Sequence, residues 1–209
     1  MERLVSVRWL RAGYLVVLLT LSAMAGPAAR GAPARPVQVR LETSAGPIVI
    51  ELDLRRAPIT TGNFLRYADE KRFDGTRFYR AARNRRNPQV GLVQGGINHK
   101  VVRARAPIAH EPTSRTGLRH LDGTVSMARN APGTAMGDFF ITVGPAAYLD
   151  ARPGSAGYAP FGKVVAGMPI IRRILAAPTH PGGYSAEMKG QTLVSPIRII
   201  TARRVVPRD

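Results

Sequence analysis

The chain has 209 residues, no cysteine, and 31 basic against 13 acidic residues, which give a formal net charge of +18 at pH 7. This length suits a single large domain, and a chain without cysteine cannot be held together by disulfides. The positive charge is spread along the chain without a dense basic tract and is carried mainly by arginine. We therefore expect no nucleic-acid partner, while attraction to anionic surfaces at low salt stays open.

Residues 1–25 have the pattern of an export signal. Three arginines form a basic start, residues 14–24 are an apolar run too short to span a bilayer comfortably, and the small residues "AMA" offer a cleavage site after Ala25. We expect a periplasmic protein with no stable membrane insertion once the signal is removed. The alternative is a protein anchored to the membrane by an uncleaved signal.

A leader separates this signal from the first strand pattern. Residues 26–36, "GPAARGAPARP", are rich in proline, glycine and alanine and have no periodic apolar face. This composition is typical of a flexible segment. The folded domain is therefore predicted to cover residues 37–209.

Within this domain, apolar residues mostly recur at every second position, which is typical of half-buried β-strands. The first two such runs, 37–41 and 48–54, are joined by the turn "SAGP" and predict a hairpin. Six further strands are predicted at "RFY" (77–79), "GLVQ" (91–94), "GTVSMA" (123–128), "DFFITV" (138–143), "FGKVV" (161–165) and "PIRIITARRV" (196–205).

Two helices interrupt the strands. Residues 57–70 have an apolar face that begins near Thr60 and Thr61, either of which is a suitable N-cap, and residues 168–177 have a second apolar face. About eight strands in one chain favour closure, because a closed barrel leaves no edge exposed to aggregation. The pattern therefore predicts a mainly β protein, a closed eight-stranded barrel whose ends the two helices cover.

A series of short blocks makes this pattern more specific. In chain order they are "FYR", "VQGG", "GTVSMAR", "DFFITV", "YLD", "FGKVVAGM" and "PTH". Together they resemble the cyclophilins, most closely the exported bacterial type, from about Val37 to the C-terminus. The resemblance implies an eight-stranded antiparallel barrel capped by two helices, and peptidyl-prolyl cis-trans isomerase activity during the folding of exported proteins. The implied partners are proline-containing segments of unfolded or folding exported proteins, and we expect a monomer.

This activity needs little chemistry from the protein. Rotation about the Xaa-Pro bond has a barrier of roughly 18 to 20 kcal/mol, and no covalent bond is made or broken. An apolar pocket for the proline ring and one fixed cation are sufficient, so we expect no cofactor and no metal. His99, His110, His120 and His180 lack metal-ligand spacing and Ser126 has no evident base partner, so we interpret them as structural.

Three residues are assigned catalytic roles by the resemblance. Arg80 matches the arginine of the family's Phe-His-Arg segment, which hydrogen-bonds the substrate and stabilises the twisted amide. Gln94 matches the glutamine beside that arginine, and Phe140 matches the ring at the base of the proline pocket. A guanidinium suits the first role because it stays protonated and presents several rigid donors.

The remaining matches are substrate-binding positions. Leu92 occupies the place of a family methionine on the pocket wall, and the backbone of Ala128 and Arg129 is implied to pair with the peptide. The other substrate-binding positions are Asp138, Tyr148, Leu149 and Tyr158.

The chain also departs from the family pattern. Thirteen residues separate Arg80 from Gln94, more than is usual, and they include Arg83, Arg85 and Arg86, which we assign to a polar loop. Gly91 replaces an apolar wall residue, so that wall is missing or rebuilt by the longer loop.

Two more departures change the polar groups of the pocket. Asp138 replaces a glutamine, exchanging a donor and acceptor for an acceptor only. Tyr148 replaces the tryptophan of cyclosporin-sensitive members, so we expect weak binding of that drug. These changes keep an alternative open, a catalytically weak peptide-binding chaperone or scaffold of the cell envelope.

Overall fold

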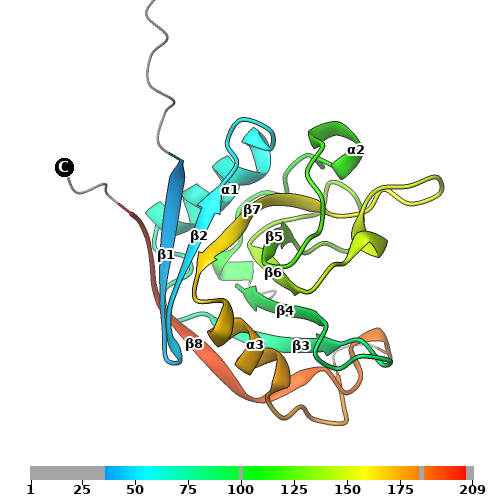
Figure 1. Ribbon diagram of the computed structural model, residues 1–209. Helices are drawn as coiled ribbons and strands as arrows, with labels where there is room; N and C mark the ends of the chain where they lie inside the picture. Colours follow the sequence, from blue (N-terminus) through cyan, green and yellow to red (C-terminus); the bar gives the residue numbers. More distant parts are fainter. Residues whose placement is uncertain (1–35, 99–100, 184–185, 206–209) are drawn as a thin grey trace, which may run out of the picture. The chain divides into compact units, whose positions relative to one another are not determined.

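Eight antiparallel strands close into a barrel in the order β1-β2-β7-β5-β6-β4-β3-β8 (Figure 1). The computed structural model describes residues 36–98, 101–183 and 186–205, so the predicted export signal and nearly all of the leader lie outside the described residues. The strands are β1 (Val37–Thr43), β2 (Gly46–Leu52), β3 (Arg77–Arg83), β4 (Gly91–Gly96), β5 (Thr124–Met127), β6 (Asp138–Val143), β7 (Ala159–Ala166) and β8 (Thr192–Arg204). The predicted fold class is confirmed.

Three helices accompany the barrel: α1 (Pro58–Asp69), α2 (Thr113–Thr116) and α3 (Met168–Ala176). The sequence pattern predicts α1 and α3 but not α2, because a single helical turn is too short to show an apolar period. Short 3₁₀ turns lie at Val101–Arg103, Ala147–Leu149 and Ala186–Met188. No helix in the part of the chain that the structure describes is long and apolar enough to cross a membrane.

The barrel interior is filled by aromatic rings that meet around Phe64 of α1. Its ring centroid lies 4.9 Å from that of Phe73, 5.3 Å from that of Phe139 and 5.1 Å from that of Phe161. All four side chains are buried, so α1 is held by packing of one aromatic side chain among three others. At the opposite end of the barrel (Figure 1), α3 buries Ile171 and Ile174 against the same core.

The N-terminus of α1 is capped by a residue far away in the sequence. The carboxylate of Glu111, which is 1% exposed, accepts hydrogen bonds from the backbone N–H of Ile59 at 3.2 Å and from that of Thr60 at 2.7 Å. It also accepts one from the Thr60 hydroxyl at 2.7 Å. The prediction that Thr60 or Thr61 caps the helix is therefore wrong: the cap residue is Ala57, which makes no side-chain cap bond. Local sequence cannot show an acceptor that lies about fifty positions away.

Removing this distant cap should destabilise the fold. Glu111→Ala leaves one buried and one part-buried backbone donor and one buried hydroxyl without their acceptor, so we expect the free energy of unfolding to fall by about 2 to 4 kcal/mol. Urea denaturation of the purified protein measures this loss. The matched control is Glu42→Ala, which removes an exposed carboxylate paired with Arg40 and should cost less than about 1 kcal/mol. Equal losses for the two variants would show that Glu111 does not hold α1.

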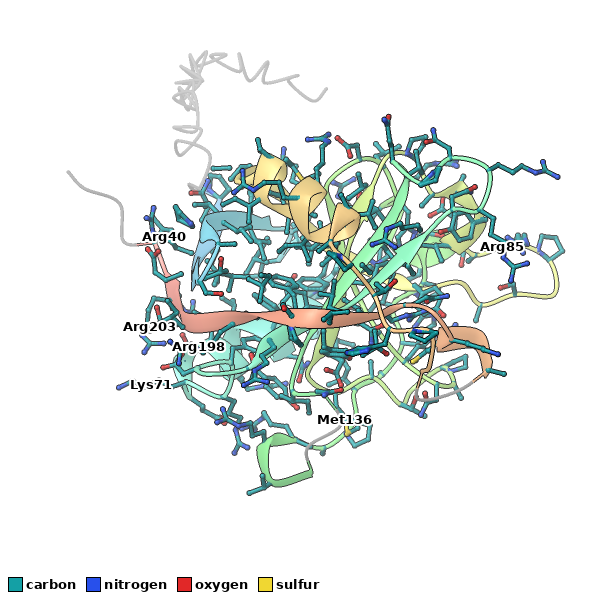
Figure 2. The ribbon with its side chains drawn as sticks, turned by 90° about the horizontal axis from the view of Figure 1, so that it is seen from below. Arg40, Lys71, Arg85, Met136, Arg198 and Arg203 are labelled. Carbon is teal, nitrogen blue, oxygen red and sulfur yellow. The ribbon has the colours of Figure 1, made fainter. Side chains whose placement is uncertain are left out.

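Basic side chains project from several parts of the molecule. Figure 2 shows Arg40, Arg198 and Arg203 toward one end and Arg85 at the other. Some of this charge is neutralised locally, since Arg40 pairs with Glu42 and Arg203 pairs with Asp74 at 2.7 Å. The latter contact holds the pKa of Asp74 below its usual range, through the hydrogen bond from Arg203.

Candidate functional site

A pocket of about 830 Å³ opens on the side of the barrel formed by β3, β4 and β6. All residues that the sequence analysis selected for the site line this one pocket: Arg80, Leu92, Gln94, Ala128, Arg129, Asp138, Phe140, Tyr148, Leu149 and Tyr158. Further lining residues that the sequence gave no reason to select include Met136 and Met188. The structure thus brings together residues that are spread over nearly eighty positions of the sequence.

Strand register places the three predicted catalytic residues side by side. Arg80 of β3 lies opposite Gln94 of β4, and Gln94 lies opposite Phe140 of β6. Directly opposed residues of antiparallel strands present their side chains on the same face. The register of β3 shifts between Phe78 and Arg80 against both of its neighbours, and such a bulge re-aims side chains.

The guanidinium of Arg80 is held at two nitrogens. Its Nη1 donates to Gln94 Oε1 at 2.7 Å, and its Nε donates to Gln191 Oε1 at 2.8 Å. Burial lowers the pKa of Arg80 from its ordinary value, but arginine remains a cation in proteins. Of its five N–H donors, these bonds occupy two, so the remaining three are the ones that a ligand in the pocket would meet.

Phe140 forms the apolar floor of the pocket. It packs with Leu149 and Ala146 in a small hydrophobic cluster separate from the barrel core, against which Leu92, Ala128 and Tyr158 also pack. The Tyr158 ring meets Phe140 edge-on, with 5.3 Å between ring centroids. A shallow apolar surface bounded by aromatic edges suits a small ring such as that of proline.

Ala128 and Arg129 form one border of this floor. The backbone N–H of Ala128 donates to Asp138 O at 2.9 Å, so any pairing of Ala128 with a bound peptide would use its carbonyl oxygen. The Arg129 guanidinium carbon lies 4.9 Å from the centroid of the Tyr158 ring, and its Nη2 donates to Gly157 O. Its buried Nε has no hydrogen-bond partner among the described residues. The side chain of Arg129 therefore adds a further cation to the pocket lining, beside Arg80 and Arg83 and beyond the backbone role that the resemblance implies.

Asp138 lies at the back of the pocket and is only 5% exposed. Its Oδ1 accepts hydrogen bonds from the backbone N–H of Asn98 at 2.7 Å and from the Tyr79 hydroxyl at 3.2 Å. A buried carboxylate with these two hydrogen bonds fixes the positions of the Asn98 backbone and the Tyr79 hydroxyl. Gly96, at φ +125°, makes room for it, because a Cβ there would approach Asp138 Oδ1 to 2.9 Å.

The segment between β3 and β4 differs from the prediction in one respect. Arg83 is the last residue of β3, and its guanidinium donates to the carbonyl oxygens of Leu175 (2.7 Å) and Ala177 at the C-terminus of α3. It is therefore not a loop arginine but a cap of α3, where a cation complements the helix dipole. Arg85 and Arg86 are exposed in the loop, as expected.

The missing apolar wall has a physical explanation. A Cβ on Gly91 would come within 2.1 Å of Ala82 O, so β4 approaches β3 too closely for a side chain at this position. Asn84 of the long segment and Met188 of a different segment are among the residues that line the pocket. That this wall is missing or rebuilt by the longer loop stays a prediction.

A buried polar network lies beneath Phe140. His120 Nδ1 is 2.6 Å from Asp150 Oδ1, and His120 Nε2 is 3.0 Å from Ser126 Oγ. The expectation that Ser126 lacks a base partner is therefore wrong. Ser126 is nevertheless 0% exposed, so no substrate reaches it. The His120 ring instead stacks on Phe140, with 5.9 Å between centroids and 14° between planes, and the network supports the pocket floor.

Burial keeps His120 neutral. Burial lowers the pKa of His120 from its ordinary value of 6.5, against the opposing effect of Asp150. The unfolded chain, whose histidine titrates near 6.5, therefore binds more protons than the folded protein just below that pH, and stability falls as pH falls from about 6.5. Neutral imidazole with Nδ1–H donating to Asp150 leaves Nε2 to accept from Ser126.

We expect this His120 effect in a measured pH profile of stability. The free energy of unfolding should decline below about pH 6.5 in the parent, and His120→Gln should lower stability overall but flatten this part of the profile. Exposed His180 serves as the control position, since His180→Gln should leave the slope unchanged. Nitrogen NMR should show an Nδ1–H tautomer for His120, and an imidazolium at pH 7 would contradict the assignment.

No group of three or more His, Asp or Glu residues that could hold a metal ion occurs within residues 36–98, 101–183 and 186–205. His99, one of the histidines considered above, lies outside the described residues. The pocket offers an apolar floor and fixed hydrogen-bond donors.

Comparison with known proteins gives a consistent result. Residues 38–203 match the family model described as cyclophilin type peptidyl-prolyl cis-trans isomerase/CLD. A protein of Acinetobacter baylyi named peptidyl-prolyl cis-trans isomerase is 36% identical over 169 residues, covering 79% of this chain and 84% of the relative. Peptidyl-prolyl cis-trans isomerase B of Escherichia coli is 32% identical over 160 residues, covering 75% of this chain and 94% of the relative.

Solved structures share the fold. A crystal structure of a Cryptosporidium parvum cyclophilin type peptidyl-prolyl cis-trans isomerase superimposes with a TM-score of 0.64 at 21% identity, covering 83% of this chain and 99% of the other. A second structure of that protein, determined in the presence of the dipeptide Ala-Pro, has a TM-score of 0.63.

Proposed function

The chain belongs to the cyclophilin-type peptidyl-prolyl cis-trans isomerases, and we propose that its pocket accelerates rotation about Xaa-Pro bonds through Arg80, Gln94 and Phe140. The observation that carries this assignment is the register of β3, β4 and β6. It aligns a fixed guanidinium, an amide and an apolar ring along one row of the pocket.

The chemistry follows from the electronic structure of the amide. Ground-state resonance draws the nitrogen lone pair into the carbonyl, and rotation through 90° breaks this conjugation. In the twisted state the lone pair is localised on nitrogen, which becomes pyramidal and accepts a hydrogen bond. A donor aimed at that nitrogen binds the transition state more tightly than either planar isomer, which is the requirement for catalysis.

Each residue of the row has a distinct part in this mechanism. The proline ring rests on Phe140, so the acyl side of the bond turns while the ring stays in place. Arg80 supplies the donor to the proline nitrogen. Gln94 holds Arg80 through its Oε1, and this bond fixes the donor before the substrate arrives, so little reorganisation is needed during rotation.

We expect Arg80→Ala to lower kcat/KM on a short Xaa-Pro peptide by about 10²- to 10³-fold, because it removes a charged donor used mainly in the transition state. Arg80→Lys should not restore turnover, since a flexible ammonium does not reproduce a planar fork of donors. Peptide binding, measured by calorimetry, should change less than turnover.

The control for this series is the double variant Arg85→Ala/Arg86→Ala. Both side chains are exposed loop cations, so turnover of a neutral peptide should stay within a few-fold of the parent. Arg83 is left unchanged because it caps α3. If the loop variant lost activity while Arg80→Ala kept it, the catalytic arginine would be assigned wrongly.

A second function has a specific observation in its favour. Gly91 and the altered wall beside it leave less apolar surface on one side of the pocket, which suits a module that binds peptides but turns them over slowly. The same peptide assay separates the two functions. Binding without acceleration would favour the chaperone or scaffold, whereas acceleration that depends on Arg80 favours the enzyme.

The proposed cellular role is assistance to exported proteins as they fold in the periplasm. It is supported by the basic and apolar pattern of residues 1–25 and the "AMA" sequence at their end. The proposed clients are proline-containing segments of such proteins, met by a monomer without cofactor and without a nucleic-acid partner. If residues 1–25 were not cleaved, they would anchor the protein to the membrane.

Location is testable on native material. N-terminal sequencing of the protein recovered from the periplasmic fraction should give a start at Gly26 or within a few residues of it. A cytosolic protein that retains Met1 or Glu2 would overturn the proposed role, and a membrane-bound protein with an intact N-terminus would support the anchored alternative.

A further inference from the structure

We propose that Tyr79, Asp138 and Gln191 are positioning residues that hold the Arg80 guanidinium in one orientation from two sides. This inference rests on the proposed function, because it assigns to these residues a task in the isomerase reaction. It goes beyond the pairing of Arg80 with Gln94, which by itself holds the glutamine amide at its oxygen only.

The first side is a chain of hydrogen bonds that runs from the pocket to the back of the barrel wall. Arg80 Nη1 donates to Gln94 Oε1 at 2.7 Å, Gln94 Nε2 donates to the Tyr79 hydroxyl at 2.7 Å, and that hydroxyl donates to Asp138 Oδ1 at 3.2 Å. Tyr79, Gln94 and Asp138 are each at most 5% exposed. Water therefore has little access to the links that connect them.

The two ends of the chain determine the direction of every bond between them. A guanidinium only donates, so Gln94 must turn its oxygen toward Arg80 and its NH₂ toward Tyr79. A carboxylate only accepts, so the Tyr79 proton must point to Asp138 and its lone pairs to Gln94. Burial and the adjacent Asp138 carboxylate raise the pKa of Tyr79, which favours the protonated hydroxyl that this bond requires.

The chain joins two positions at which this sequence differs from the pattern it resembles. Tyr79 stands where the Phe-His-Arg segment has histidine, and Asp138 stands where a glutamine precedes the double phenylalanine. The structure shows that these two changed side chains touch each other. They therefore form a matched pair, and Asp138 acts on Arg80 through Tyr79 and Gln94 rather than on the substrate directly.

The second side is Gln191, which immediately precedes β8. Its side-chain oxygen accepts from Arg80 Nε at 2.8 Å, and its backbone oxygen accepts from the N–H of Ala81 at 2.9 Å. Gln191 thus hydrogen-bonds both the side chain of Arg80 and the backbone of the next residue, Ala81. Two nitrogens of the Arg80 guanidinium are bonded to separate fixed acceptors. The planar group therefore cannot rotate about the terminal torsions of the side chain, and its remaining N–H donors point in one direction.

The test begins with Tyr79→Phe, which keeps the ring and removes the link between Gln94 and Asp138. We expect kcat to fall about tenfold while KM stays within about twofold, since the bound state is unchanged and the donor is less well aimed. Gln191→Ala should act in the same way. Tyr67→Phe is the matched control, because it also removes a buried tyrosine hydroxyl, here one that accepts a hydrogen bond from the backbone N–H of Arg105, and it should lower stability without changing kcat.

A conservative substitution at Asp138 distinguishes a role in positioning Arg80 from a role in packing. Asp138→Asn keeps an oxygen that accepts from Tyr79 and should retain most of the turnover, whereas Asp138→Leu, of similar size, should lose as much as Tyr79→Phe. If Asp138→Asn were as impaired as Asp138→Leu, the acceptor role of this residue would be wrong.

A double-mutant cycle decides whether the effect passes through Arg80. Tyr79→Phe should cause no further loss of kcat in the Arg80→Ala background, because residues that act only through Arg80 have nothing left to orient. Additive losses would overturn the proposal. Nitrogen NMR of the Arg80 side chain provides a readout independent of turnover: Tyr79→Phe and Gln191→Ala should each increase its mobility, and unchanged mobility would also overturn it. An inactive parent with an ordered Arg80 would instead contradict the proposed function alone.

Discussion

The site depends on keeping one half-buried guanidinium charged, oriented and accessible to a ligand. Removing a cation from water is costly unless fixed acceptors replace the lost hydration. Around Arg80 these acceptors are two glutamine oxygens, from β4 and from the residue before β8. These bonds stabilise the charge and leave three of the five guanidinium N–H groups for the pocket that Arg80 lines.

Barrel closure supplies the rigidity that this arrangement needs. One row of residues crosses half of the barrel wall. Along this row, Arg80 of β3 lies opposite Gln94 of β4, Gln94 lies opposite Phe140 of β6, and Phe140 lies opposite Ser126 of β5. Because every strand is paired on both sides, a shift of one strand would break bonds to two others. The backbone hydrogen bonds of the sheet, rather than loops, therefore hold the hydrogen-bond donors and the apolar floor of the pocket at fixed separations.

Phe140 shows how layers behind the pocket contribute to its shape. The Phe140 ring makes an edge-on contact with Tyr158 and stacks on the ring of His120. His120 is itself held between Asp150 and Ser126, so a polar network fixes the plane of an apolar floor. A Ser-His-Asp arrangement that is closed to solvent thus serves structure, since a nucleophile must be reachable to act.

The sequence by itself determined the strand pattern, the helices α1 and α3 and ten of the residues that meet in the pocket, because period-two and helical apolar spacing and the short blocks are local signals. It also located the departures at Gly91, Asp138 and Tyr148. Only the tertiary structure decided what surrounds Gly91 and Asp138. That Glu111 caps α1, that Arg83 caps α3 and that Asp138 bonds Tyr79 all depend on pairs far apart in the chain. Hydrogen bonds act over about 3 Å, and only closure of the barrel brings such residues within that distance.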